Sequence, residues 1–138
     1  MTKESKEWLQ KAWEDFRVME HEMALPPSER VASAVCFHAQ QFVEKALKAF
    51  LVAHGKEFPR THNLTFLKEL CSAVDADFAE LPVDELSIYA VELRYPGLGI
   101  SPEPSECERC AQIAREVKHF LESKLGVKFE LLGRLEEA

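Results

Sequence analysis

The chain has 138 residues, an apolar fraction of 46% and a formal net charge of −7. This length is typical of one domain with a core of its own, so we expect residues 1–138 to form a single helical domain with residues 127–138 as a C-terminal tail. The acidic balance argues against broad, nonspecific nucleic-acid binding, which depends on neutralising phosphates. No apolar run approaches the roughly 20 residues of a membrane span, and the charged N-terminal sequence lacks the apolar region of a secretory signal. We therefore expect a cytoplasmic protein without membrane contact.

Hydrophobic periodicity predicts two long helices in the first part of the chain. The first spans residues 3–24, where apolar side chains recur every three to four residues until Pro26 and Pro27 end the helix. The second is predicted from Ser28, as its N-cap, to Gly55, as the first residue beyond its end, a length of about 27 residues. Its apolar arc extends well past half a turn, which predicts neighbours on two or three sides. The centre of this arc comprises Val31, Val35, Phe42, Ala46, Ala49 and Ala53.

Three further helices are predicted from cap residues. Asn63 is the expected N-cap of a short third helix, Pro82 the expected first position of a fourth, and Ser105 the expected cap of a fifth that Gly126 ends. The fourth is expected to end at Arg94, before a loop rich in proline and glycine. The tail has an apolar patch that could dock on the bundle or on a second subunit, comprising Val127, Phe129, Leu131 and Leu132. We predict an all-α fold, an antiparallel four-helix up-and-down bundle with one additional short helix.

A polar stripe follows the second helix beside its apolar arc. It consists of His38, Gln41, Lys45 and Lys48, whose spacing of i, i+3, i+7 and i+10 stacks the side chains on one face. One interpretation is a solvated helix edge, on which Glu44 and Lys48 form a weak ion pair. The other interpretation is a binding stripe for an anion or an acidic partner helix.

Charge is unevenly distributed along the sequence. Residues 38–68 carry five lysine or arginine side chains and two glutamates, whereas residues 71–108 carry nine carboxylates and one arginine, Arg94. The first segment could hold a phosphate that the second repels, unless these blocks do not correspond to patches on the surface. Arg94 and Tyr95, directly before Pro96, form a second candidate anion site, although an arginine at a helix end can also bind the last carbonyls.

Two histidines are candidates for a functional role. His38 could carry a proton, or could be hydrogen-bonded at the edge of the core. His62 lies in a loop directly before a helix cap and could tie this loop to the helix end. No Ser/His/Asp or Cys/His spacing and no phosphate-binding glycine loop is visible. We therefore assign no catalytic residue and no cofactor.

The four cysteines are expected to be thiols. Cys36 and Cys71 lie in apolar helical contexts and are interpreted as core residues. Cys107 and Cys110 form a single C-x-x-C, without the two further ligands that a zinc site requires, so no metal site is assigned. We interpret them as incidental thiols at the start of a helix. The alternative is a redox or metal role, because a helix N-terminus lowers the pKa of a thiol.

Residues 36–70 resemble the signature of the HEPN domain family. The matching strings are FHAQQFVEKALKAFL, the loop with P-x-THNL and the later ELRYP, and the likeness spans roughly residues 6–125. The resemblance implies an antiparallel four-helix bundle with a short additional helix, usually dimeric. This fold agrees with the one predicted from periodicity.

The resemblance implies two alternative functions. Many HEPN proteins are metal-independent ribonucleases, whose motif is an arginine followed, after four to six intervening residues, by a histidine at a dimer interface. Others are partners of a minimal nucleotidyltransferase in a toxin–antitoxin-like pair, and resemble the helical domain that completes the site of kanamycin nucleotidyltransferase. The implied partners are therefore a second copy of the chain, a nucleotidyltransferase, and a nucleotide or RNA.

The sequence departs from the ribonuclease motif. None of the residues five to seven positions after Arg94 is a histidine. Seven residues separate Arg30 from His38, and three separate Arg115 from His119. This spacing favours a binding module without catalysis of its own, rather than a ribonuclease.

We therefore predict a HEPN binding module and keep a second hypothesis. The nucleotide or anion site of the module is expected at His38, Gln41, Lys45, Lys48, Arg94 and Tyr95, with His62 as a loop candidate. The second hypothesis is a ribonuclease with a non-standard site, in which Arg94 stabilises the phosphate and His38 or His62 moves the proton.

Overall fold

All regular structure in residues 1–90 and 102–132, the part of the chain that the computed structural model describes, is helical. This confirms the predicted all-α fold. The α-helices are α1 (Lys3–Met23), α2 (Ala32–Ala53), α3 (Leu64–Val74) and α4 (Pro104–Leu125). The 3-10 helices are η1 (Pro27–Glu29), η2 (Ala76–Glu80), η3 (Val83–Ala90) and η5 (Phe129–Leu131). The predicted end of the fourth helix and the loop after it, up to residue 101, lie outside the described residues, as do residues 133–138.

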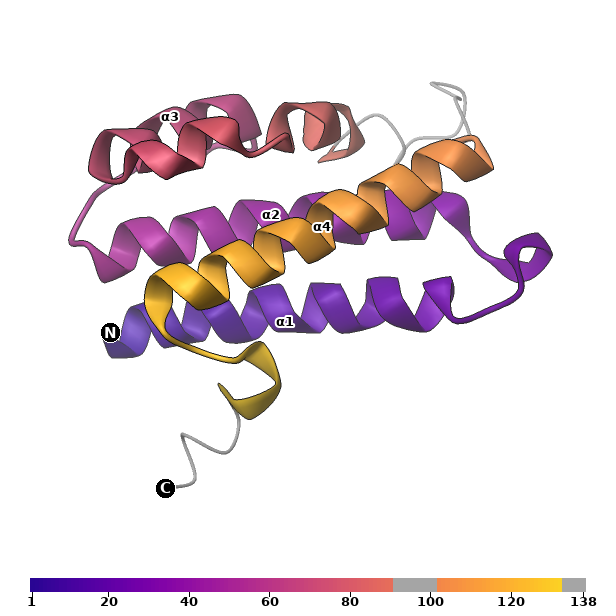
Figure 1. Ribbon diagram of the computed structural model, residues 1–138, viewed down its shortest axis with the longest axis horizontal. Helices are drawn as coiled ribbons and strands as arrows, with labels where there is room; N and C mark the ends of the chain where they lie inside the picture. Colours follow the sequence, from indigo (N-terminus) through magenta and orange to yellow (C-terminus); the bar gives the residue numbers. More distant parts are fainter. Residues whose placement is uncertain (91–101, 133–138) are drawn as a thin grey trace.

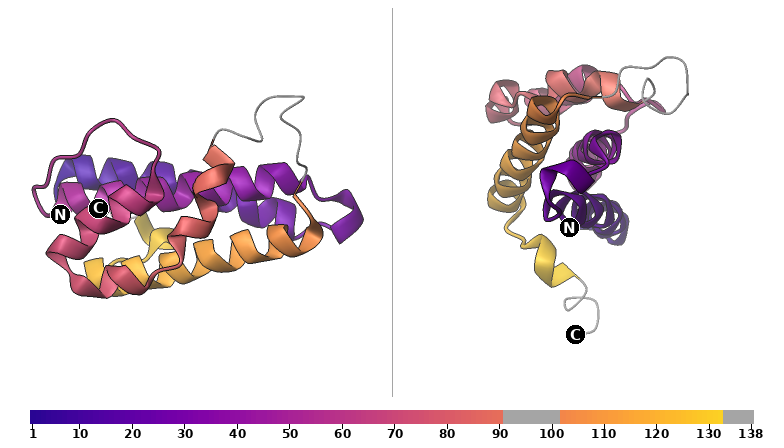
Figure 2. Two further views of the ribbon diagram at one scale, coloured as in Figure 1. Left: turned by 90° about the horizontal axis from the view of Figure 1, so that it is seen from above. Right: turned by 90° about the vertical axis from the view of Figure 1, so that its right-hand side faces the viewer.

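The elements form an up-and-down bundle around α2. Helices α1 and α2 lie side by side and antiparallel, and α3, η2 and η3 then lead the chain back across the molecule to the start of α4 (Figure 1). Helix α2 packs against α1, α3, η3 and α4, and the end-on view in Figure 2 shows this arrangement. The prediction that the long helix has neighbours on several sides is therefore confirmed.

The start of α2 differs from the prediction. Ser28 lies in η1, and α2 begins only at Ala32, which leaves a helix of 22 residues. Between them Arg30 has extended backbone, and its guanidinium donates to the carbonyl oxygens of Met23 and Leu25 at 2.8 and 3.0 Å. Arg30 thus satisfies carbonyls at the end of α1, and this contact interrupts the predicted continuous helix.

The core-facing arc of α2 was predicted correctly at its four central residues but not at its two ends, because Ala53 is only partly buried. Val35, Phe42, Ala46 and Ala49 are fully buried, and Phe42 packs on Phe16 of α1 with ring centroids 4.9 Å apart. Val31, by contrast, is 53% exposed, because it precedes the helix.

Three predicted helix boundaries are confirmed by their local geometry. The Asn63 side chain accepts a hydrogen bond of 3.0 Å from the backbone N–H of Phe66, as an N-cap does. Gly55 and Gly126 follow the ends of α2 and α4 with φ of +68° and +65°, a backbone conformation that disfavours side chains with a Cβ.

The segment after Pro82 is helical but has a tighter form than predicted. It forms the 3-10 helix η3, in which Val83, Leu86 and Tyr89 are buried. Side chains three residues apart align along a 3-10 helix, so this spacing places all three on the core.

The cap of α4 also differs from the prediction. Glu103, not Ser105, is the N-cap, and the Glu106 carboxylate accepts the backbone N–H of Glu103 at 3.4 Å. The side chain three positions after the cap therefore bonds back to it, as in a capping box.

The C-terminal segment docks on its own bundle. Phe129 is fully buried, and the centroid of its ring lies 5.9 Å from that of Trp13 and 5.4 Å from that of Phe42. Leu132 is buried as well. Leu131 is 42% exposed. The first of the two predicted uses of the apolar patch, docking within the chain, is therefore confirmed for Phe129 and Leu132.

No helix among the described residues combines the length and the apolarity needed to cross a bilayer.

Candidate functional site

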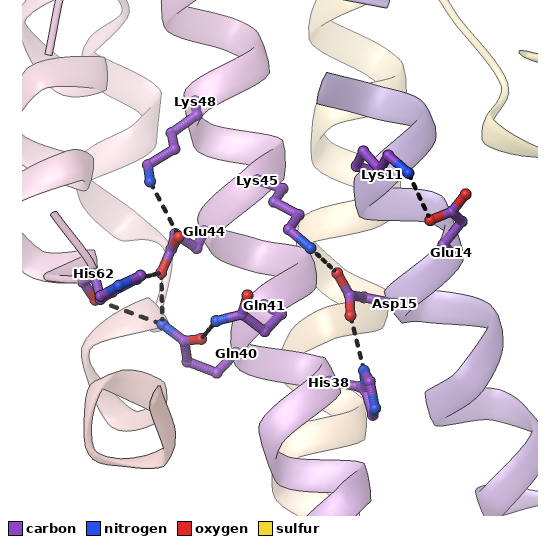
Figure 3. A network of polar contacts seen from close by, with 10 residues as sticks. All are labelled: Lys11, Glu14, Asp15, His38, Gln40, Gln41, Glu44, Lys45, Lys48 and His62. Atoms are coloured by element: carbon purple, nitrogen blue, oxygen red, sulfur yellow. Dashed lines mark hydrogen bonds and ion pairs between the residues drawn. The ribbon is translucent and has the colours of Figure 1, made fainter. Parts of the chain in front are cut away.

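The polar residues of α2 divide into two networks, each centred on one carboxylate. Figure 3 shows His38 and Lys45 directed toward Asp15 on α1, whereas Gln40, Glu44 and Lys48 lie toward the loop that carries His62. We call these the Asp15 network (Asp15, His38 and Lys45) and the Glu44 network (Gln40, Gln41, Glu44, Lys48 and His62). The four residues of the predicted stripe are therefore divided between two sides of α2: His38 and Lys45 belong to the Asp15 network, and Gln41 and Lys48 belong to the Glu44 network.

The Asp15 network joins α1 to α2. One carboxylate oxygen of Asp15 lies 2.8 Å from Nδ1 of His38, and the other lies 2.6 Å from Nζ of Lys45. Because the ionised carboxylate only accepts hydrogen bonds, Nδ1 of His38 must carry the donated proton. The side chain of Asp15 is only 10% exposed, so these two donors replace the water that burial removes.

The Glu44 network joins α2 to the loop before α3. Glu44 accepts hydrogen bonds from Lys48 at 3.0 Å, His62 at 2.9 Å and Gln40 at 3.2 Å. Gln41 extends the network by donating to the side-chain oxygen of Gln40 at 2.7 Å. Side chains from the helix and from the loop therefore meet at one buried carboxylate.

Lys48 is held between this carboxylate and two aromatic rings. Its ammonium nitrogen lies 5.5 Å from the ring centroid of Trp8 on α1 and 5.7 Å from that of Phe58 in the loop. Both side chains of the Lys48–Glu44 pair are less than 10% exposed. The predicted ion pair is therefore present, but it lies inside the protein and not on a solvated helix edge.

His62 is the most exposed member of either network. Its side chain is 62% exposed, although Nδ1 is held by the buried Glu44 carboxylate. The predicted role of tying the loop to a helix is consistent with this contact, and the contact also orients the ring so that its outer edge meets solvent. A histidine oriented in this way by a carboxylate has the arrangement that general acid–base catalysis uses.

Two central residues, Asp15 and Gln40, were not predicted from the sequence. Asp15 lies on the apolar face of α1, between the buried Ala12 and Met19. Gln40 is fully buried on α2. A polar residue on an apolar helix face is the signal that could have identified both, because a buried polar group requires a partner.

The remaining candidates are not brought into these networks. Arg94 and Tyr95 lie outside the described residues. Among residues 1–90 and 102–132, no three histidine, cysteine or carboxylate side chains gather in a way that could hold a metal ion.

Comparison with known proteins identifies the family. The family model of the HEPN domain matches residues 5–124, which include both networks. The chain belongs to the HEPN domain family. The resemblance read from FHAQQFVEKALKAFL is therefore confirmed, and that string contributes to both networks of this HEPN domain.

A solved structure shares the fold. The HEPN domain described above is similar to the crystal structure of TT1696 from Thermus thermophilus, with a TM-score of 0.66 and 22% sequence identity. The match covers 89% of this chain and 99% of that chain. None of the curated proteins matches the chain.

Proposed function

We propose that this HEPN domain is a binding module without catalysis of its own, which pairs with a minimal nucleotidyltransferase in a toxin–antitoxin-like system. The observation that carries this proposal is that the cations of the stripe are already paired. Lys45 is bound to Asp15 and Lys48 to Glu44, so neither ammonium group is free to stabilise a reacting phosphate. The missing arginine–histidine spacing of the ribonuclease motif supports the same conclusion.

A nucleotide contact is a second part of the proposal. A phosphate at the stripe would have to compete with Asp15 for Lys45, whose side chain is 25% exposed, and for His38, which is 26% exposed. Lys48 is too buried to reach a nucleotide without opening the Glu44 network. We therefore propose that His38, Gln41 and Lys45 form the accessible part of the stripe, and that Arg94 and Tyr95 supply a further anion contact.

The pairing is tested by co-expression. The chain and the nucleotidyltransferase encoded beside its gene, if there is one, are produced together and separated by size-exclusion chromatography with light scattering. We expect one peak that contains both chains, with this chain as a homodimer, and we expect labelled ATP to be retained in this peak. Separate elution of the two proteins, or a neighbouring gene of another kind, would contradict the pairing.

A ribonuclease remains the alternative function, because the Glu44–His62 contact supports it. A buried carboxylate that binds Nδ1 of an exposed histidine fixes the orientation and the tautomer of the ring, so that Nε2 faces solvent as a proton acceptor. His62 would then move the proton, and Arg94 would stabilise the phosphate.

Incubation with RNA separates the two functions. We expect less than a twofold increase in cleavage over buffer for the purified HEPN domain, with the same result for Arg94→Ala and His62→Ala. Cleavage that is at least tenfold above buffer and is lost in both variants would replace the binding module with the ribonuclease. Cleavage that both variants retain would indicate a contaminating nuclease, which a repeat with protein from a second purification scheme would remove.

A further inference from the structure

The C-terminal segment, residues 127–132, is anchored on the bundle by an aromatic side chain. After α4 the chain turns back and places η5 beside α1 (Figure 1). Phe129 of this segment is fully buried, in ring contact with Trp13 of α1 and Phe42 of α2. Such ring contacts add to the free energy gained by burying the aromatic side chains, so they hold the segment in place.

A buried ion pair of α4 supplies the polar part of the same surface. Lys118 and Glu122 lie 3.2 Å apart, and both side chains are less than 10% exposed. Nζ of Lys118 is also 2.8 Å from a carboxylate oxygen of Glu130. The Glu122 carboxylate accepts the backbone N–H of Phe129 at 3.0 Å. The surface thus fits an aromatic residue directly followed by a carboxylate, which the segment itself supplies. We call it the docking surface, consisting of Trp13, Phe42, Lys118 and Glu122.

The contacts at the docking surface do not require that the segment belong to the same copy of the chain. Each contact joins a residue of the segment to a helix that precedes it in the sequence. An identical segment from a second copy therefore makes the same contacts, and for this reason domain swapping is a low-cost route to a dimer. The direction that the chain takes after α4 then decides which copy the segment reaches.

Gly126 is the residue at which the chain turns toward its own docking surface. It caps α4 with a φ of +65°, and its N–H donates to the carbonyl oxygen of Glu122 at 2.9 Å. A Cβ at Gly126 would meet no heavy atom of the described residues within 4 Å outside its own helix and chain neighbours. The turn therefore depends on the left-handed backbone that glycine allows, and not on a lack of space.

The sequence around Gly126 also fits a helix that continues. Leu121, Leu125 and Phe129 recur four residues apart, and Leu132 follows three residues later. This spacing places apolar side chains on one face of a helix. If α4 continued through Gly126, Phe129 would move outward along the helix axis by 1.5 Å per residue instead of returning to α1.

We propose that the docking surface is an interface with a second copy of the chain, on which the two copies exchange their C-terminal segments. The turn at Gly126 gives the closed form described above, and an α4 that is continuous through Gly126 gives the exchanged form. In the exchanged form, Phe129 and Glu130 of each copy occupy the docking surface of the other copy. This interface lies apart from the Asp15 and Glu44 networks, so it does not depend on the proposed function.

Cross-linking of isotopically mixed chains tests the exchange. Labelled and unlabelled full-length chains are unfolded in urea, mixed in equal amounts, refolded at high concentration and treated with a carbodiimide, which joins a carboxylate to an adjacent amine without a spacer. Mass spectrometry then measures the cross-linked Lys118–Glu130 peptides, since these two groups are 2.8 Å apart. A cross-link between a labelled and an unlabelled peptide comes from two copies.

The isotope pattern separates exchange from any other dimer. We expect a minor fraction of mixed cross-links in the unmodified chain, which increases with the protein concentration during refolding. A dimer that forms through a different surface gives cross-links between peptides of the same label, because each segment stays on its own copy. Cross-links of the same label alone, at every concentration, would overturn the proposal.

Two glycine variants test the hinge. Gly126→Ala disfavours the positive φ and favours a continuous α4, so we expect its fraction of mixed cross-links to be at least about threefold higher. Gly55→Ala is the matched control, because Gly55 has a φ of +68° and equally open surroundings but follows α2. Its fraction should equal that of the unmodified chain. Equal fractions in the two variants would contradict the role of Gly126.

A third variant tests whether Phe129 is the anchor in both forms. In Gly126→Ala combined with Phe129→Ala, we expect all Lys118–Glu130 cross-links to decrease together, because the buried ring holds Glu130 beside Lys118. Mixed cross-links retained at the level of Gly126→Ala would show that exchange does not use the docking surface. If Gly126→Ala does not refold, the mixed fraction of the unmodified chain still decides the proposal.

Discussion

Replacing Glu44 with alanine is expected to lower the free energy of unfolding by about 3 to 5 kcal/mol. The substitution leaves the Lys48 ammonium, whose side chain is only 8% exposed, without its carboxylate partner. It also removes the acceptor of His62 and Gln40. Breaking a buried pair costs more than the pair itself contributes, because the remaining charge stays in a medium that solvates it poorly. Urea unfolding followed by circular dichroism measures the difference.

Two further variants identify the cause of this loss. In the double variant Glu44→Ala with Lys48→Met no charge is left unpaired, so we expect it to recover a large part of the lost stability. Glu69→Ala removes an exposed glutamate from α3 and is expected to change the free energy of unfolding by less than about 0.5 kcal/mol. A Glu44→Ala variant as stable as Glu69→Ala would show that the Glu44 network contributes little to the fold.

The substitution Phe129→Ala is expected to destabilise the fold by about 3 to 5 kcal/mol. Phe129 is fully buried between Trp13 of α1 and Phe42 of α2, so a shortened side chain leaves a cavity in the core. Its backbone N–H also donates to the buried Glu122 carboxylate at 3.0 Å, which holds η5 against α4. The emission of Trp13 should change as well, because this ring loses its stacking contact with Phe129 and keeps the one with Phe16.

Leu131→Ala is the matched control in the same segment. Leu131 is 42% exposed, so its loss should change the free energy of unfolding by less than about 1 kcal/mol and leave the emission of Trp13 unchanged. If Phe129→Ala were no more destabilising than Leu131→Ala, the docking of the C-terminal segment would contribute nothing to the stability of the bundle.

The two networks explain why the basic residues of α2, although they recur at helical spacing, do not all face solvent. A lysine ammonium group on α2 that lies next to a buried carboxylate forms an ion pair with it instead of facing solvent. The carboxylate need not lie on the same helix. Lys45 bonds to α1, whereas Lys48 bonds within α2 and packs on Trp8 and Phe58. For the proposed module, this arrangement gives α2 a role in holding α1 and the loop with His62 in place, and leaves the exposed edge of His62 for contact.

The sequence by itself determined the helical class, the family and several boundaries. These depend on interactions within a few residues. The Asn63 side chain caps its own helix, Gly126 adopts positive φ directly after α4 and Gly55 does so one residue later after α2, and apolar periodicity marks the buried face of α2. Of the boundaries that the sequence missed, the start of α4 also depends on a local contact, that of Glu106 with the backbone of Glu103, whereas the start of α2 depends on the end of α1. Ser28 is displaced as a cap because Arg30 binds the carbonyls at the end of α1.

Only the tertiary structure decided which partners the polar and thiol side chains have. Asp15 meets His38 and Lys45 from 23 and 30 residues away, Glu44 meets His62 from 18 residues away, and Cys107 meets Met23 from 84 residues away. The physical reason is that burial makes an unpaired charge or polar group costly, so its partner is whichever group the packing of the helices brings within hydrogen-bond distance. Helical spacing places residues on a face, but the position of the neighbouring helix determines what that face contacts.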